Sequence, residues 1–240
     1  MDINEKFVKN NDILFRAEDH VYKSKSNPEI EFTSVTQFVK KFFSEFDSQK
    51  ISKKLVSSHP VYQHMTQEEL LAKWEKSSEM GRIVHKEIED YINTGKEAIE
   101  GKSKTAINYL KKNINQKLEL YPEVIVHSKK LKIAGTIDLI IYNKEDDEYN
   151  LVDWKTNKAI KRKAFKNKKG IKQSTKDLDD CQYIHYSLQL SLYKFLLEED
   201  GFKNINKISI MHLKDNEILY ISCKYMKNEV QNMLKEKRLI

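Results

Sequence analysis

Three residues in two strand-like apolar runs are the strongest candidates for chemistry in this sequence. Asp153 and Lys155 lie two residues apart in a run of β-branched and aromatic residues. Because alternate residues of a strand share a face, the acid and the amine point the same way, while Val152 and Trp154 point to the other face. Upstream, Asp138 lies alone in an apolar run, where a charge is costly unless it is paired or metal-bound.

A polar turn at about residues 144–148 can join the two strands as a hairpin and bring Asp138 beside Asp153. Two carboxylates this close repel each other unless a cation lies between them, and hard oxygen ligands select Mg²⁺ or Mn²⁺. Such an ion polarises a phosphoryl oxygen and lowers the pKa of a bound water, and Lys155 can orient that water or stabilise developing charge. The pattern therefore predicts metal-assisted phosphodiester chemistry.

The alternative is structural. Asp153 and Lys155 would form a surface ion pair on an edge strand, and Asp138 would begin a turn. An isolated Asp-x-Lys favours that interpretation, because the motif is short and both residue types are common. The context favours catalysis, since a helix-like segment farther along carries Gln189 and Tyr193 four residues apart, on one face.

The elements that position these residues follow from the hydrophobic pattern. Short β-prone runs at 13–15, 21–22 and 30–32 precede a helix that begins near Val35 and is capped by Thr33 or Ser34. Helices are predicted over 65–92, with Gly95 as the stop, and over about 105–120, ending before Pro122. The remaining predicted elements are strands at 124–126, 133–142 and 149–154, a helix over 181–199, strands at 205–213 and 217–222, and a C-terminal helix.

The composition fits a folded, helix-rich protein with one main core. Apolar residues make up 39% and charged residues 33% of 240 residues, with 6 Gly and 3 Pro, which excludes collagen-like and low-complexity chains. No apolar stretch approaches the roughly 20 residues of a membrane span, and Met1–Glu5 lacks the features of a secretory signal. Cys181 and Cys223 are the only cysteines, too few for an iron–sulfur cluster. We expect a cytoplasmic protein with no membrane partner and no iron–sulfur cluster.

Five short motifs occur in one order over roughly residues 80–200. They are Gly81–His85, Glu123 after Tyr121–Pro122, Gly135–Asp138, Asp153–Thr156 and Gln189–Tyr193. Together they resemble the PD-(D/E)XK nuclease superfamily, RecB-like branch, similar to viral and phage exonucleases and to the mitochondrial genome maintenance exonuclease. The resemblance implies an α/β fold with a restriction-endonuclease-like core, a mixed central sheet flanked by helices, and a helical N-terminal region. Residues 1–80 would form an N-terminal hairpin and helical region packed on a nuclease core, 81–240, that includes a basic loop at 156–176.

The resemblance also implies roles for single residues. His85, Asp138 and Asp153 match metal ligands, the carbonyl of Trp154 is a further candidate ligand, and Lys155 matches the catalytic lysine. The other interpretation of His85 is a histidine with no ligand role.

Three more residues match the family motifs. Glu123 matches the acid of the first motif, either as a catalytic group behind the ligands or as a solvated glutamate at the start of a strand. Gln189 and Tyr193 match a helix that lies beside the site and helps to hold the lysine and the nucleic-acid backbone.

A basic segment follows the proposed catalytic strand. Residues 156–176 contain nine Lys or Arg and no acid, so they carry +9 of a total net charge of +7, and the rest of the chain carries −2. We expect Lys158, Lys161, Arg162 and Lys163 to contact phosphates, with steep salt dependence and little sequence preference. The alternative is a plain solvated loop.

The leading hypothesis is a Mg²⁺- or Mn²⁺-dependent deoxyribonuclease, an exonuclease on single-stranded or free-ended DNA. Two alternatives stay open: an inactive nuclease-fold DNA-binding subunit, and a ribonuclease with the same site. No GxxxxGK[ST] motif is present, so a helicase or recombinase would be a separate protein. The pathway stays open among viral replication, DNA recombination, DNA repair and defence, and the protein would act in the host cytoplasm if it is viral.

Overall fold

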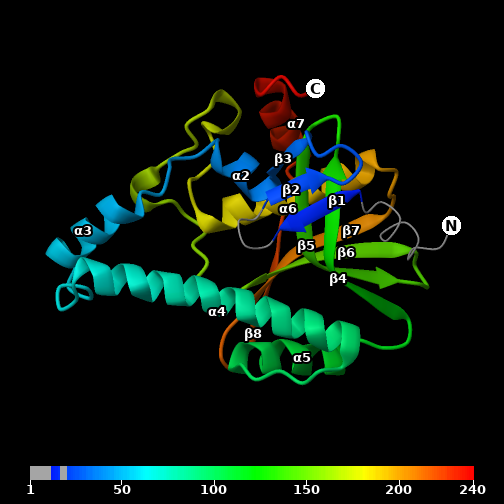
Figure 1. Ribbon diagram of the computed structural model, residues 1–240, viewed down its shortest axis with the longest axis horizontal. Helices are drawn as coiled ribbons and strands as arrows, with labels where there is room; N and C mark the ends of the chain where they lie inside the picture. Colours follow the sequence, from blue (N-terminus) through cyan, green and yellow to red (C-terminus); the bar gives the residue numbers. More distant parts are fainter. Residues whose placement is uncertain (1–11, 17–20) are drawn as a thin grey trace.

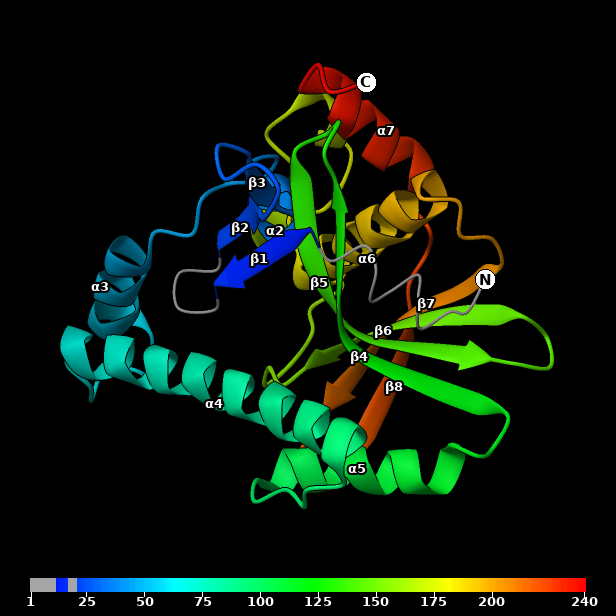
Figure 2. The ribbon, with the colours of Figure 1, turned by 45° about the vertical axis from the view of Figure 1, so that its right-hand side comes forward.

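The computed structural model describes residues 12–16 and 21–240, and Met1–Glu5, on which the expectation about a secretory signal rests, lies outside them. Within the described residues, eight strands form one mixed sheet with helices on both sides (Figure 1 and Figure 2). The strands are β1 (Ile13–Arg16), β2 (Val21–Ser24), β3 (Glu31–Ser34), β4 (Leu118–Ser128), β5 (Ile133–Asn143), β6 (Glu148–Lys155), β7 (Ile205–Leu213) and β8 (Ile218–Ser222). The helices are α2 (Val35–Lys40), α3 (Ser48–Ser58), α4 (Gln67–Thr94), α5 (Gly101–Asn113), α6 (Gln182–Glu199) and α7 (Lys227–Glu236), with short 3₁₀ turns η1 (Phe165–Asn167) and η2 (Gln173–Thr175). The mixed α/β architecture expected from the sequence is confirmed.

The centre of the sheet is the strand β5. Antiparallel β4 pairs along nearly its whole length, so β3 and β6 must share the opposite edge. There β3 pairs in parallel with Ile133 and Ala134, and β6 pairs antiparallel with the stretch from Leu139 to Asn143. The four residues 135–138 lie between these two pairings, and the strands β3 and β6 diverge around them. This gap in the ladder is where a site can form.

Two apolar layers hold the sheet between the helices. One lies under α2, α6 and α7 and contains fully buried residues such as Leu188 and Leu234. The other lies under α4 and α5, where Val84 and Leu110 pack on Val152 and Trp154 of β6. Both views show α4 and α5 side by side along one edge of the molecule, away from α6 and α7 (Figure 1 and Figure 2). Val152 and Trp154 therefore point into the core under α4 and α5, while Asp153 points to the opposite face of the sheet, toward α6, as predicted.

Helix α4 begins and ends where the sequence predicts. Thr66 caps it in a capping box with Glu69, and Gly95 ends it with a left-handed φ of 75°. Ser34 is the cap of α2, one of the two candidates. The helix runs without a break across residues 80 and 81, so the domain boundary expected there falls inside α4. No helix in the described part of the chain is long and apolar enough to cross a membrane.

The helix predicted over 105–120 is wrong in its second half. Helix α5 ends at Asn113, the backbone of Ile114 is extended, and Leu118 begins β4 opposite Asn143. The helical spacing of Ile107, Leu110, Ile114 and Leu118 misled the prediction because it continues past the end of α5: Ile114 packs on the same core from the loop, and Leu118 lies in β4. Pro122 lies inside β4, which tolerates it because, among residues 12–16 and 21–240, β4 is an edge strand paired only with β5.

Helix α3 has no counterpart among the predicted elements. Only Ser52 of its residues is buried, and Ile51, Leu55 and Val56 are its only apolar residues, so this short helix offers few positions from which to be recognised.

Candidate active site in the gap between β3 and β6

A cavity of about 630 Å³ opens at the gap beside residues 135–138 of β5. Seven residues expected from the sequence line it: His85, Glu123, Asp138, Asp153, Lys155, Gln189 and Tyr193. They come from α4, β4, β5, β6 and α6. The fold therefore brings together side chains that lie up to 108 positions apart in the chain, between His85 and Tyr193.

His85, Glu123 and Asp138 form a group that can hold a metal ion. One ligand atom of each lies within 4.8 Å of the others. Glu123 lies opposite Asp138 across the β4–β5 ladder, because Pro122 pairs with Leu139 and Val124 pairs with Ile137. The backbone of Glu123 has a positive φ of 50°. His85 reaches the same point from α4, with Nδ1 3.6 Å from Oδ2 of Asp138. One imidazole and two carboxylates suit a hard or borderline divalent cation.

The electrostatics of this group favour a cation. Burial, followed by the charge of Asp138, raises the pKa of Glu123 to about 8. Without an ion, Glu123 therefore keeps its proton at neutral pH. A divalent cation between the carboxylates would remove the repulsion and displace that proton.

The backbone of Trp154 ties two of these ligands to β6. The carboxylate of Asp138 accepts a hydrogen bond from the Trp154 N–H, with 2.7 Å between N and Oδ2. Beyond Leu139 and Val152 the two strands are no longer paired, so the Asp138 side chain takes the place of the missing ladder bond. Nε2 of His85 lies 3.1 Å from the Trp154 carbonyl oxygen, the expected further metal ligand, so this carbonyl contacts the imidazole.

Asp153 and Lys155 form a buried ion pair beside the metal-binding group. Oδ2 of Asp153 lies 2.5 Å from Nζ of Lys155, and the two side chains are 3% and 17% exposed. Burial raises the pKa of Asp153 to about 6 against the effect of Lys155. Burial alone would lower the pKa of Lys155, but the charges of Asp153 and Asp138 outweigh it and raise that pKa above its ordinary value. At neutral pH the pair is therefore charged on both sides.

The structure divides the expected ligand set into two parts. His85, Asp138 and Glu123 have ligand atoms close enough together for one ion, and metal ligation by Asp153 stays a prediction. Asp153 is occupied by Lys155 and by the Nε2 amide of Gln189, which donates to Oδ1 at 3.1 Å.

Helix α6 supports this arrangement from behind. Gln189 holds Asp153, and Tyr193 lies against β5 at Gly135, where an added Cβ would come 2.7 Å from Cε1 of the tyrosine. Gly135 is therefore the residue that lets the Tyr193 ring reach the site. The ring of Tyr186, one turn before Gln189, lies 4.7 Å from Nζ of Lys155 and adds a cation–π contact.

Two parts of the cavity wall were not anticipated. Phe15 and Tyr22 of the N-terminal hairpin line it, and the Tyr22 hydroxyl lies 2.9 Å from Oγ1 of Thr136. Local sequence patterns do not predict this contact, because the two partners lie 114 positions apart in the chain. Arg82 and Lys86 also line the cavity. Arg82 lies three residues before His85 on α4 and four before Lys86, and this helical spacing was a signal that could have found them.

The residues of the basic segment, 156–176, lie in different parts of the structure. Lys158 lines a second cavity next to the first, while Lys161, Arg162 and Lys163 are not among the residues that line either cavity. Arg162 lies over the ring of Tyr183, with 4.9 Å from Cζ to the ring centroid.

Farther along, the segment is folded onto the body. Thr175 is buried, and its hydroxyl donates to the Phe42 carbonyl oxygen at 3.0 Å. Lys169 pairs with Asp179 at 2.7 Å.

Comparison with known proteins agrees with this geometry. A family model of the PD-(D/E)XK nuclease superfamily matches residues 49–237. A search of curated proteins found no match. A solved structure described as "Crystal structure of SSO0001" is similar over 100% of this chain and 85% of its own, with 16% identity and a TM-score of 0.43, too low to carry an argument. Because the family model matches most of the length of this chain, the chain belongs to the PD-(D/E)XK nuclease superfamily.

Proposed function

We propose that this protein is a divalent-metal-dependent deoxyribonuclease of the RecB-like branch that acts as an exonuclease on single-stranded or free-ended DNA. Its superfamily consists generally of metal-dependent phosphodiester hydrolases. The observation that carries the proposal is the position of the Asp153–Lys155 ion pair in the same cavity as the His85–Glu123–Asp138 group. An acid cluster and an ammonium group side by side suit a reaction that needs both a cation and a proton donor next to a phosphate.

His85, Glu123 and Asp138 are the residues that would hold Mg²⁺ or Mn²⁺. When bound there, the ion supplies Lewis acidity toward a phosphoryl oxygen and toward water. Lys155, the only one of these residues with an ammonium group, donates hydrogen bonds to the attacking water or to a non-bridging oxygen of the phosphate. Asp153 keeps Lys155 charged and aimed into the cavity, and Gln189 keeps Asp153 in place.

The direct test is hydrolysis of end-labelled single-stranded DNA with Mn²⁺ and with EDTA. We expect cleavage with the metal only, and loss of cleavage in Lys155→Ala and in Asp153→Asn. Lys194→Ala is the matched control, because Lys194 is a similarly buried lysine with 13% side-chain exposure that contacts Glu198 on the far part of α6. Full activity of both site variants would refute the assigned chemistry.

Two alternatives use the same fold. An inactive DNA-binding subunit would bind DNA without metal and without turnover, but such a protein has no need of a buried Lys155 held by Asp153. A ribonuclease with the same site would cleave an RNA oligomer faster than a DNA oligomer of equal sequence.

The dependence on a free end is tested separately. Linear strands should be degraded and circular single strands should survive; equal cleavage of both would make the protein an endonuclease. A helicase or recombinase, where one takes part, would be a separate partner, and the proposed setting is the cytoplasm.

A further inference from the structure

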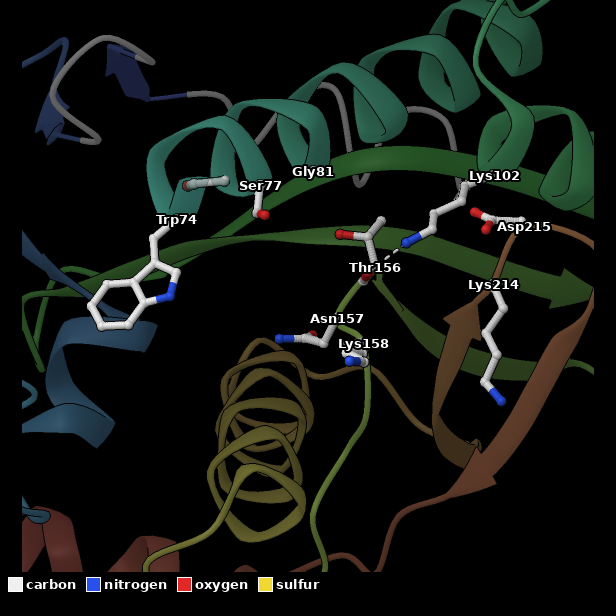
Figure 3. Close-up of a pocket in the computed structure, with 10 residues that line it drawn as sticks. Trp74, Ser77, Gly81, Lys102, Thr156, Asn157, Lys158, Lys214 and Asp215 are labelled. Carbon is white, nitrogen blue, oxygen red and sulfur yellow. Dashed lines mark hydrogen bonds between the residues drawn. The ribbon is translucent and has the colours of Figure 1, made fainter. Parts of the chain in front are cut away.

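A second cavity, of about 690 Å³, lies beside the active-site cavity (Figure 3). Its walls come from α4, the beginning of α5, the chain directly after β6, and the turn between β7 and β8. None of the proposed metal ligands lines it.

The two cavities meet on α4. Ser78 and Gly81 line both of them. At the same place the chain leaves β6, so Lys155 lines the active-site cavity while Thr156 lines the second one. A Cβ at Gly81 would lie 3.3 Å from Oγ1 of Thr156, so α4 and the chain after β6 approach each other closely here. A bound chain that followed α4 would therefore pass from one cavity to the other at Gly81.

The second cavity is strongly basic. Lys102, Lys158 and Lys214 line it together with one acid, Asp215. Lys102 is fixed, because its Nζ donates to the Thr156 carbonyl oxygen at 2.8 Å, as Figure 3 shows. An adjoining hollow of about 280 Å³ adds two more lysines, Lys73 and Lys76. Lys214 is paired with Glu217 at 2.9 Å, so five ammonium groups face two carboxylates, and this excess still favours a polyanion over a neutral ligand.

Aromatic rings stand at the end of this basic surface. Trp74 lines the cavity at the end opposite Lys214 in Figure 3. The ring of Phe46, which is 64% exposed, lies 5.6 Å from the Trp74 ring. Lysines that neutralise phosphates, together with a ring on which a base can stack, are the combination by which proteins hold single strands. The bases of a duplex are stacked inside the helix and cannot use such a ring.

We infer that this second cavity binds the single-stranded nucleic acid that flanks the scissile phosphate, with Lys158 and Lys214 on its phosphates and Trp74 stacked on a base. The inference rests on the proposed function for the identity of the neighbouring site. It makes the proposed substrate more specific, because the nucleic acid on this side of the reaction centre would have to be single-stranded.

The experiment measures binding of a fluorescein-labelled 20-nucleotide oligothymidylate by anisotropy in EDTA, where no metal-dependent cleavage takes place. The variants are Trp74→Ala, Trp74→Phe and the pair Lys158→Gln with Lys214→Gln. The control pair is Lys203→Gln with Lys207→Gln, which removes the same charge around the opposite end of β7 from Lys214. The melting temperature of every variant is recorded to show that it folds.

We expect Trp74→Ala to bind about tenfold more weakly and Trp74→Phe to bind nearly as the parent does. The lysine pair should lower the slope of log affinity against log salt by about 1.4, at about 0.7 for each phosphate contact. Trp74 and Trp154 are the only tryptophans, and Trp154 is buried, so unlabelled oligothymidylate should quench protein fluorescence through Trp74. That quenching should be lost in Trp74→Phe, and a 20-base-pair duplex should produce little of it.

The inference is overturned if Trp74→Ala and the lysine pair bind as the parent does, or if the duplex binds and quenches as well as the single strand. In that case cleavage by the parent protein with Mn²⁺ would leave the proposed function intact. If the expected binding and quenching occur but no cleavage follows with any divalent metal, the proposed function fails and the inferred strand site stands.

Discussion

Metal binding should be coupled to the loss of a proton from Glu123. The metal-free pKa of about 8 arises from burial and from the nearby charge of Asp138. At pH 7 a group with this pKa is protonated in about nine of ten molecules, and at pH 9 in about one of ten. Since a carboxylate must be ionised to hold a metal, Mn²⁺ binding should release about 0.9 proton from Glu123 at pH 7 and about 0.1 at pH 9.

The same arithmetic gives the pH dependence of affinity. The contribution of Glu123 raises the apparent Mn²⁺ affinity about tenfold between pH 6 and 7, but only about twofold between pH 8 and 9. Glu123→Gln removes this titration and keeps the size of the side chain. It should bind Mn²⁺ more weakly and with a flatter pH profile.

Titration calorimetry in buffers with different ionisation enthalpies measures the number of protons released. The informative quantity is the difference between the parent and Glu123→Gln, because protons from other groups cancel in it. If both proteins released the same number of protons at pH 7, Glu123 would not be a buried, protonated ligand, and the reasoning from the site electrostatics would be refuted.

Three further predictions concern the same site. Lys155→Ala should lower the cleavage rate by about 10²-fold or more while Lys194→Ala leaves it unchanged, measured with end-labelled DNA; equal rates in the two variants would contradict the role of the lysine. Gly135→Ala should lower the free energy of unfolding by about 1–3 kcal/mol, because the new Cβ would clash with the Tyr193 ring. Urea unfolding measures this loss, and adding Tyr193→Leu to Gly135→Ala should relieve it. The free energy of unfolding of the metal-free protein should fall as pH rises from the ordinary pKa of 4.5 through about 8, by at most about 1.4 kcal/mol per pH unit. It falls because the folded state keeps a Glu123 proton that the unfolded chain has lost. Thermal unfolding in EDTA checks the last point, and a rise in stability over this range in the parent relative to Glu123→Gln would contradict it.

The local parts of the site could be predicted from the sequence because they depend on strand alternation. Asp153 and Lys155 share a face, and Val152 and Trp154 fill the opposite core, as the two-residue period requires. The placement of Asp138 beside this strand followed from the hairpin turn.

The division of labour among the acids could not be predicted in this way. Whether Glu123 or Asp153 lies nearer the metal position depends on where β3 and β6 leave β5, and this divergence is a property of the whole sheet. The contact of Tyr22 with Thr136 and the cavity around Trp74 likewise join segments that no local pattern connects. For helix α5 the sequence pattern predicted too much, since the last two residues of the helical spacing, Ile114 and Leu118, lie in a loop and in β4.

The most direct test of the central claim is an anomalous difference map from crystals soaked with Mn²⁺. The account predicts a peak at coordination distance from the Asp138 carboxylate and the His85 imidazole, with Glu123 as a further ligand and Nζ of Lys155 nearby but not bound. A saturated crystal with no peak at Asp138, or with manganese only at surface carboxylates elsewhere, would contradict it.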